Sequence, residues 1–219
     1  ASIVDKDGVG HSKVDKKIDS VCPYCGVGCQ IEYNVKDNKI KYVNGVDGPA
    51  NKNRLCVKGR FGFDYVNNPE RLTKPLIRIK DKAKDLHPNI NFSNIHEYFR
   101  EASWDEALDY AAQGFLKLKK QRNGTSNLAG FGSAKCSNEE AYLFQKLIRT
   151  GFNTNNVDHC TRLCHASSVA ALLETIGSGA VTAPFYEVEH SDVIIVIGAN
   201  PTENHPVAAT FFKNAAKKG

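Results

Sequence analysis

Three cysteines in one short loop place the strongest constraint on how this chain can fold. They are Cys22, Cys25 and Cys29 in "CPYCGVGC", and a fourth, Cys56, follows after 26 further residues. Such a set offers a metal centre three ligands from one loop and one ligand from a distance. Structural zinc sites usually pair two Cys-x2-Cys hooks, whereas a cubane [4Fe–4S] cluster suits this uneven arrangement. The spacing therefore favours an iron–sulfur cluster, with zinc or no metal as alternatives.

The composition narrows the class of protein further. The seven cysteines are unevenly placed, with four among the first 56 residues, which favours a metal site in a reducing compartment over a disulfide framework. The net charge of +5 is spread along the chain and forms no basic stripe for nucleic acid. No apolar run approaches the roughly 18–20 residues of a membrane span. The chain lacks methionine even at position 1, so we expect an incomplete chain, an internal piece of a longer protein.

The sequence divides into three segments. Residues 1–19 are polar and rich in Lys, Asp and Gly, which is typical of a linker. Residues 20–75 are predicted to form a small domain of loops and short antiparallel strands, with a hairpin turn at Asp37 and Asn38. It has few large apolar residues, so a metal centre would help it to fold. Residues 76–219 are predicted to form a partial α/β domain with a parallel sheet.

Helices and strands alternate in the last part of the chain. Apolar residues recur at the helical period over 103–120, and further helices are predicted over 137–150 and 167–177. Residues 127–134 are predicted to be a short strand ending in glycines. The apolar run of 191–201, "SDVIIVIGANP", is typical of a buried parallel strand that opens into a loop. Capping-box pairs mark the first two helices, Ser103 with Glu106 and Ser137 with Glu140.

Two further features suggest chemistry, and each has a plainer alternative. Lys58 follows Cys56 by two residues and is either a surface lysine or a cation that raises the potential of a cluster. Cys164 and His165 precede the predicted helix of 167–177, where the helix dipole favours a thiolate and an adjacent His can act as acid or base. The alternative is a structural cysteine beside an ordinary histidine.

The loop "GANPTENHP" of residues 198–206 follows the predicted strand. Ligands of α/β sheets bind beyond the carboxyl ends of strands, so Asn200, Glu203 and Asn204 could hydrogen-bond a nucleotide-like group. The alternative is a plain strand-to-helix turn, because the loop lacks the Gly-x-Gly-x-x-Gly spacing. Cys136 and Cys160 are interpreted as structural cysteines.

Taken together, the motifs resemble those of the molybdenum or tungsten bis-pterin oxidoreductase family, with the closest likeness to the catalytic subunit of metal-dependent formate dehydrogenases. The resemblance extends from about Ile18 to the end of the chain. It depends on six motifs in order: "CPYCGVGC", "LCVKGRFG", "RLTKPLIR", "SWDEAL", "TNNVDHCTRLCH" and "GANPTENHP".

The resemblance implies roles for individual residues. It implies that the four cysteines of the first motifs are the ligands of a [4Fe–4S] cluster, and that Lys58 lies between this cluster and the pterin on the electron path. Cys164 matches the ligand to molybdenum or tungsten, where many relatives carry selenocysteine. His165 matches a histidine that assists removal of the formate hydrogen. The loop with Gly198, Asn200, Glu203 and Asn204 matches one that contacts the pterin guanine dinucleotide.

The resemblance also implies a reaction, formate oxidation to carbon dioxide, and electron-accepting partners. Related nitrate reductases usually have methionine after the cysteine ligand, so His165 favours formate over nitrate as substrate. The motif "SVCPYCGVGC" after a polar segment resembles the NAD-linked, cytoplasmic type with iron–sulfur and flavin subunits. The substrate arginine and much of the second pterin site lie outside this chain, so the chain alone is expected to be inactive. An electron-transfer iron–sulfur module without its own catalysis is the alternative from another class.

Overall fold

The computed structural model describes residues 13–80, 89–121 and 123–218. The chain forms two compact units. The first contains residues 1–71 and 182–219, so it is built from both ends of the sequence, and the second contains residues 72–181. The boundary expected between residues 75 and 76 stays a prediction.

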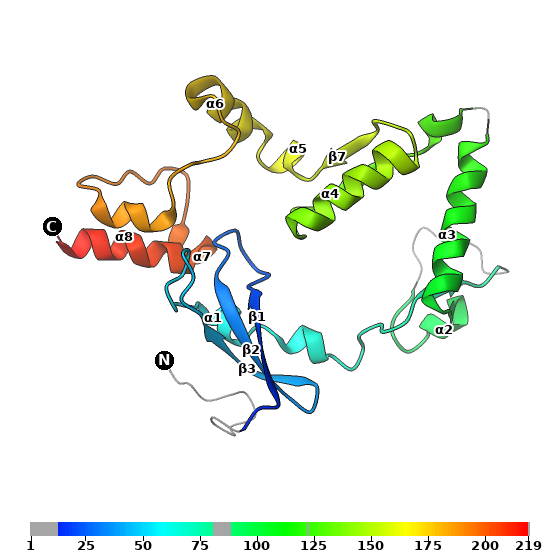
Figure 1. The fold of residues 1–219 in the computed structure, drawn as a ribbon, viewed down its shortest axis with the longest axis horizontal. Helices are drawn as coiled ribbons and strands as arrows, with labels where there is room; N and C mark the ends of the chain where they lie inside the picture. Colours follow the sequence, from blue (N-terminus) through cyan, green and yellow to red (C-terminus); the bar gives the residue numbers. More distant parts are fainter. Residues whose placement is uncertain (1–12, 81–88, 122, 219) are drawn as a thin grey trace. The chain divides into compact units, whose positions relative to one another are not determined.

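A three-stranded antiparallel sheet forms the centre of the first unit (Figure 1). Its strands are β1 (Lys16–Val21), β2 (Gln30–Lys36) and β3 (Lys39–Gly45), in that order across the sheet. Asp37 and Asn38 both have positive φ, 51° and 57°. Positive φ at both central residues is the mark of a type I′ turn, which matches the twist of a two-residue hairpin. The hairpin predicted from these two residues is therefore present.

Strand β1 lies partly within the segment expected to be a linker. It begins at Lys16 and pairs with β2 along its whole length, from Lys16 opposite Val35 to Val21 opposite Gln30. All six of its residues are exposed. No apolar pattern predicts this strand, because its stability comes from backbone hydrogen bonds to β2 and not from a buried apolar face.

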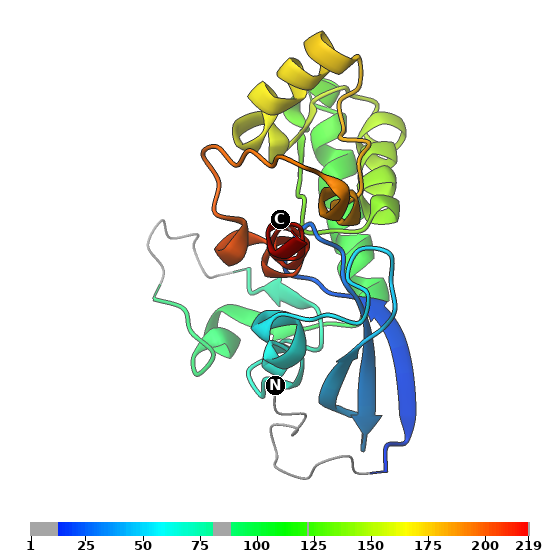
Figure 2. The ribbon, with the colours of Figure 1, turned by 90° about the vertical axis from the view of Figure 1, so that its left-hand side faces the viewer.

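Short helices pack against this sheet. Helix α1 (Val57–Phe61) and the 3₁₀ turn η1 (Asp64–Asn67) follow β3, and Ile31, Val43 and Phe63 form a small core between them. The C-terminal segment adds the 3₁₀ helix η4 (Phe185–His190), α7 (Pro201–Asn204) and α8 (Pro206–Lys218). Helix α8 buries one face of small and apolar residues, namely Val207, Ala208, Ala209 and Phe211. Figure 2 shows α8, in red, end-on.

The second unit contains two small sheets and most of the longer helices. Strands β4 (Leu76–Arg78) and β5 (Phe99–Glu101) pair antiparallel, and β6 (Gly130–Gly132) and β7 (Val157–His159) pair parallel. The remaining elements are α2 (Ile95–Tyr98), α3 (Trp104–Lys119), η2 (Gly124–Asn127), α4 (Asn138–Lys146), the π-turn η3 (Leu147–Gly151), α5 (Thr161–Cys164) and α6 (Ala166–Ile176). The predicted fold class, antiparallel N-terminal sheet followed by an α/β region with parallel pairing, is confirmed.

The helix caps follow the sequence signals closely. Ser137 accepts a hydrogen bond from the Glu140 backbone N–H at 3.2 Å, and the Glu140 carboxylate accepts one from the Ser137 N–H at 2.7 Å. This complete capping box holds the pKa of Glu140 below its usual value. At α3, Ser103 accepts from the Glu106 N–H at 3.1 Å, but the Glu106 side chain pairs with Arg100 instead.

One strand prediction is wrong. The strand predicted over residues 191–201 is absent, because residues 191–200 form no strand and Pro201 begins α7. Val193, Ile195 and Ile197 are 79%, 78% and 84% exposed. A parallel strand is stabilised by hydrogen bonds to neighbouring strands and by burial of both faces. No strand in the described part of the chain pairs with this segment, so its apolar sequence alone does not make it a strand.

None of the described helices combines the length and the apolar composition needed to cross a lipid bilayer.

We expect Ser137→Ala to loosen the first turn of α4, because it leaves the Glu140 N–H without its side-chain acceptor. The loss is about 1 kcal/mol, which corresponds to roughly fivefold faster amide exchange in that turn. Hydrogen–deuterium exchange of the peptide covering 137–146 measures it. Ser137→Asp keeps an acceptor and serves as the control, and equal exchange in the two variants would contradict the prediction.

Candidate iron–sulfur and metal centres

The loop of residues 22–29 joins β1 to β2 and carries three of the four predicted cluster cysteines. The Cys22 N–H donates to the Cys29 carbonyl at 2.9 Å, which closes the loop directly above the last strand pair. Gly28 has a φ of +70°, a conformation that glycine adopts at little cost. The backbone thereby folds back on itself and keeps the three cysteines close together.

The fourth cysteine comes from the next loop. Cys56 is the N-cap of α1, and the Cys56 carbonyl accepts from the Arg60 N–H at 3.1 Å. Helix α1 lies close to the first loop, because a Cβ built on Gly59 would sit 3.5 Å from the Cys22 sulfur. The Tyr24 hydroxyl also donates to the Gly62 carbonyl and so joins the first loop to the end of α1.

All four cysteines contact one apolar cluster. Its buried members are Val27, Cys29, Val207 and Ala208, and Cys22, Cys25 and Cys56 pack against it at partial burial. Burial and the three neighbouring thiols raise the pKa of the Cys29 thiol to about 12. A cysteine ligand must be a thiolate, so a bound cation would have to offset this raised pKa.

The thiols are compatible with an iron–sulfur cluster, although no three Cys, His, Asp or Glu side chains within the described ranges lie close enough together to hold a single metal ion. None of the seven cysteines forms a disulfide. A cubane spreads its irons over several ångströms and takes one thiolate on each. Four thiols around a shared apolar wall therefore suit an iron–sulfur cluster.

Lys58 is exposed on α1, two residues after Cys56.

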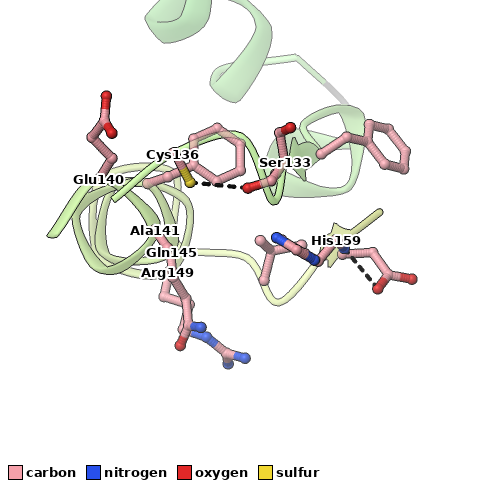
Figure 3. Close-up of a pocket in the computed structure, with 12 residues that line it drawn as sticks. Ser133, Cys136, Glu140, Ala141, Gln145, Arg149 and His159 are labelled. Atoms are coloured by element: carbon pink, nitrogen blue, oxygen red, sulfur yellow. Dashed lines mark hydrogen bonds between the residues drawn. The ribbon is translucent and has the colours of Figure 1, made fainter. Parts of the chain in front are cut away.

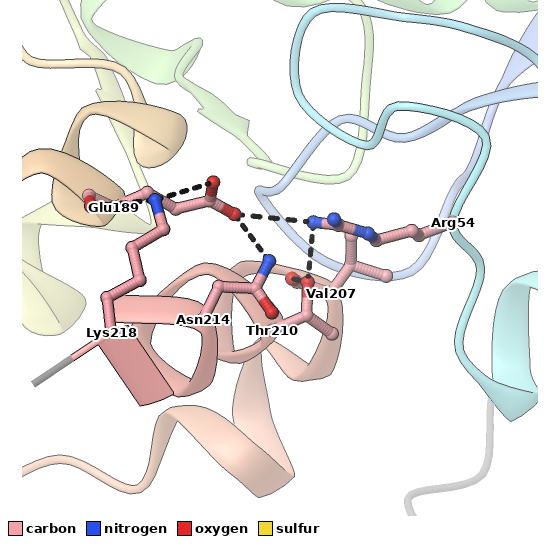
Figure 4. Close-up of polar contacts among 6 residues, drawn as sticks. All are labelled: Arg54, Glu189, Val207, Thr210, Asn214 and Lys218. Carbon is pink, nitrogen blue, oxygen red and sulfur yellow. Dashed lines mark hydrogen bonds and ion pairs between the residues drawn. The ribbon is translucent and has the colours of Figure 1, made fainter. Parts of the chain in front are cut away.

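The residue that sequence reasoning missed in this region is Arg54, two residues before Cys56. Its guanidinium donates to the Thr210 hydroxyl at 3.1 Å and lies 3.9 Å from Glu189 (Figure 4). It also stacks 4.8 Å from the centre of the Phe211 ring.

Glu189 lies at the centre of these polar contacts. Its carboxylate accepts from the Asn214 amide at 2.6 Å and lies 4.0 Å from the Lys218 ammonium (Figure 4). The Asn214 hydrogen bond, followed by the charges of Lys218, Arg54 and Lys52, lowers the pKa of Glu189. The network joins η4 and α8 to the loop before Cys56. No local sequence pattern predicts a contact between residues as far apart in the chain as Arg54 and Glu189.

The predicted molybdenum ligand lies in the second unit. Cys164 is the last residue of α5, and His165 separates α5 from α6. Both residues are exposed. Local contacts hold the segment before them. Arg162 donates to the Asp158 carboxylate at 2.8 Å and lowers the pKa of Asp158. The His159 ring lies 2.7 Å from the Thr161 hydroxyl. The junction thus places a thiol and an imidazole on two successive exposed residues of this unit.

A cavity of about 530 Å³ lies between α4 and the parallel strands of the same unit (Figure 3). It opens where β6 and β7 end, which is the usual ligand-binding edge of a parallel sheet. Its lining includes Ser133, Cys136, Arg149 and His159 but neither Cys164 nor His165. The Cys136 thiol donates to the Ser133 carbonyl at 2.9 Å, so this cysteine has a structural contact.

The loop of residues 198–206 belongs to the first unit. Gly198 has a φ of +65°, and the Asn200 amide donates to the Glu203 carboxylate at 3.1 Å. Thr202 donates to the Asn200 oxygen at 2.6 Å, and Asn204 ends the short helix α7. Asn200, Glu203 and Asn204 are exposed and form one compact polar turn.

In protein without metal, we expect Cys29 to resist alkylation. The thiolate is the nucleophile, and Cys29 is 5% exposed with a pKa raised to about 12. At pH 9 its modification should be at least about tenfold slower in the folded protein than in urea, and the difference should shrink as the pH rises toward 12. Mass spectrometry of iodoacetamide-treated protein measures it. Equal rates in both states would show that Cys29 is not enclosed.

Comparisons with known proteins agree with this description of the site. The family model "Molybdopterin oxidoreductase Fe4S4 domain" matches residues 15–68, and the model "Molybdopterin oxidoreductase" matches residues 71–219. "Probable oxidoreductase YjgC" of Bacillus subtilis (strain 168) is 41% identical over 217 residues, which are 99% of this chain and 20% of that protein.

Two further relatives carry a more specific name. "Putative formate dehydrogenase YrhE" of Bacillus subtilis (strain 168) is 41% identical over 92% of this chain and 19% of its own length. "Putative formate dehydrogenase SAR2393" of Staphylococcus aureus (strain MRSA252) is 38% identical over 99% of this chain and 20% of its own length. The chain spans about a fifth of the length of these curated relatives. With both family models matched in succession, the chain belongs to the molybdopterin oxidoreductases that carry an Fe4S4 domain.

Proposed function

We propose that this chain is part of the catalytic subunit of a metal-dependent formate dehydrogenase, which oxidises formate to carbon dioxide, a proton and two electrons. The observation that carries the proposal is the exposed Cys164–His165 pair at a helix junction, in a chain that also assembles four thiols. The names of two relatives, "Putative formate dehydrogenase YrhE" and "Putative formate dehydrogenase SAR2393", support the choice of substrate.

Cys164 and His165 have distinct roles in this proposal. A molybdenum or tungsten ion with two pterin guanine dinucleotides, when bound, supplies the two-electron chemistry. Cys164 provides the thiolate ligand, which its exposure at the end of α5 allows. His165 takes up the formate hydrogen as a proton, since an imidazole nitrogen can accept one. Because the two residues are adjacent in the chain, the ligand and the base reach the same small substrate.

The first unit carries the electrons away in this proposal. Cys22, Cys25, Cys29 and Cys56 hold the [4Fe–4S] cluster, and Lys58 lies between the cluster and a pterin. The polar turn with Gly198, Asn200, Glu203 and Asn204 contacts the guanine dinucleotide. Its side chains are exposed and rich in hydrogen-bonding groups, which supports that role. We also propose iron–sulfur and flavin partner subunits that reduce NAD in the cytoplasm, from the likeness to the NAD-linked type.

We expect the intact protein, purified anaerobically, to reduce viologen with formate. Cys164→Ser should lower this rate more than about 100-fold, because a serine hydroxyl is a poor replacement for a metal-bound thiolate. His165→Met should lower it about 10² to 10⁴-fold through loss of the base. A stopped-flow or steady-state viologen assay measures both variants.

Cys160→Ser is the matched control, because it removes an exposed thiol four residues earlier and should leave the rate unchanged. Nitrate-dependent oxidation of reduced viologen is assayed in parallel. Nitrate activity without formate activity would replace the proposed substrate with nitrate. Protein with iron but no molybdenum or tungsten, and neither activity, would indicate an electron-transfer module instead.

A further inference from the structure

The loop that carries Cys56 is joined to the three-cysteine loop by one buried side chain, that of Asn51. Asn51 is fully buried, with 0% of its surface exposed. A buried amide is costly unless its donors and acceptor are all used. Its hydrogen bonds therefore show which parts of the chain its burial holds together.

Those hydrogen bonds reach both sides of the cysteine site. On one side, the Asn51 oxygen accepts from the Gln30 N–H at 3.0 Å, and the Asn51 amide lies 3.1 Å from the Gln30 carbonyl. Gln30 directly follows Cys29. On the other side, the same amide lies 3.1 Å from the Arg54 carbonyl, two residues before Cys56, and 3.2 Å from that of Val46. One side chain thus bridges the backbone next to Cys29 and the backbone next to Cys56.

We do not expect the loop before Cys56 to keep its backbone conformation without the Asn51 side chain. Lys52 and Asn53 both have left-handed backbone, with φ of 43° and 62°, which residues other than glycine adopt at a cost. A Cβ built on Gly48 would lie 2.8 Å from the Asn51 oxygen, so the loop is closely packed around the amide. Without the Asn51 amide, we expect the loop to relax and the Cys56 backbone to move.

We propose that Asn51 is a positioning residue that keeps Cys56 in register with Cys22, Cys25 and Cys29. The inference rests on the proposed ligation of a [4Fe–4S] cluster by these four cysteines. The effect should fall on Cys56, because Gln30 is also held by its pairing with Val21 in the sheet, whereas Cys56 follows a loop. Disturbing Asn51 should expose the one iron that Cys56 holds and leave the other three in place.

The test is oxidation of the intact, anaerobically purified protein with one equivalent of ferricyanide. In Asn51→Asp, which keeps the acceptor for Gln30 but loses the amide donors, the cluster should pass one electron to ferricyanide and release one Fe²⁺. A [4Fe–4S]²⁺ cluster then becomes [3Fe–4S]⁺, which electron paramagnetic resonance and iron analysis detect. Addition of Fe²⁺ and a reductant should restore the four-iron form, because the three-cysteine loop is intact. Asn51→Ser, which keeps one donor, should convert to a smaller extent.

Asn34 offers a matched control. It is the other fully buried asparagine of the described residues, but its amide donates only to Glu32, at 3.3 Å to the carbonyl and 3.2 Å to the carboxylate. Asn34→Ser should retain a wild-type four-iron cluster. Cys56→Ala should give the three-iron form and is the positive reference.

The outcomes separate a failure of the inference about Asn51 from a failure of the proposed cluster ligation. If Asn51→Asp and Asn51→Ser both keep the cluster as wild type does, or lose all iron together, the inference is wrong. Failure of both to fold, while Asn34→Ser folds, also contradicts it, because Asn51 would then act on the whole fold. If the wild type holds no four-iron cluster, or Cys56→Ala leaves it intact, the proposed ligation itself fails.

Discussion

The packing of two cysteine loops against helix α8 is the interaction on which the first unit depends. The sheet has a small core, formed mainly by Ile31, Val43 and Phe63. A second apolar cluster lies where Val207 and Ala208 of α8 meet Val27 and Cys29. Small residues on α8 allow this close approach. With so little apolar area to bury, the unit gains much from any cation that draws the four thiols together, since binding then contributes to folding.

Polar contacts orient the loop that carries Cys56. Salt bridges at the surface are individually weak, but Arg54 combines a hydrogen bond to Thr210, the charge of Glu189 and the face of the Phe211 ring. These contacts act on the residues just before Cys56, and Asn51 acts on the same loop from the side of the sheet. The position of Cys56 is thus determined from two directions, by the sheet and by the C-terminal helix.

Local signals allowed much of this structure to be predicted from sequence. The hairpin turn at Asp37 and Asn38 and the capping box at Ser137 involve neighbouring residues, so their physics is readable in a short window. The cysteine spacing was informative because it encodes ligand geometry directly. The apolar run at 193–197 misled because hydrophobicity indicates that a segment prefers burial, whereas a strand also requires a partner strand.

The remaining features depend on contacts that sequence does not display. Asn51 reads as an ordinary loop residue in "PANKNR", and nothing local distinguishes it from its exposed neighbour Asn53. The contact of Arg54 with Glu189 joins residues far apart in the chain. Such residues become visible only once burial and hydrogen-bond partners are known, which is why the supporting side chains of the site were missed while its cysteines could be proposed from their spacing.

The construction of the first unit from both ends of the sequence has a consequence for biosynthesis. Cys56 leaves the ribosome roughly 150 residues before α8 begins at Pro206. At about 5–20 residues per second, the four thiols wait on the order of ten to thirty seconds before the helix that covers them exists. During that interval the four cysteines lack the helix that contributes Val207 and Ala208 to their apolar cluster. The site is therefore completed only after the whole second unit has been synthesised.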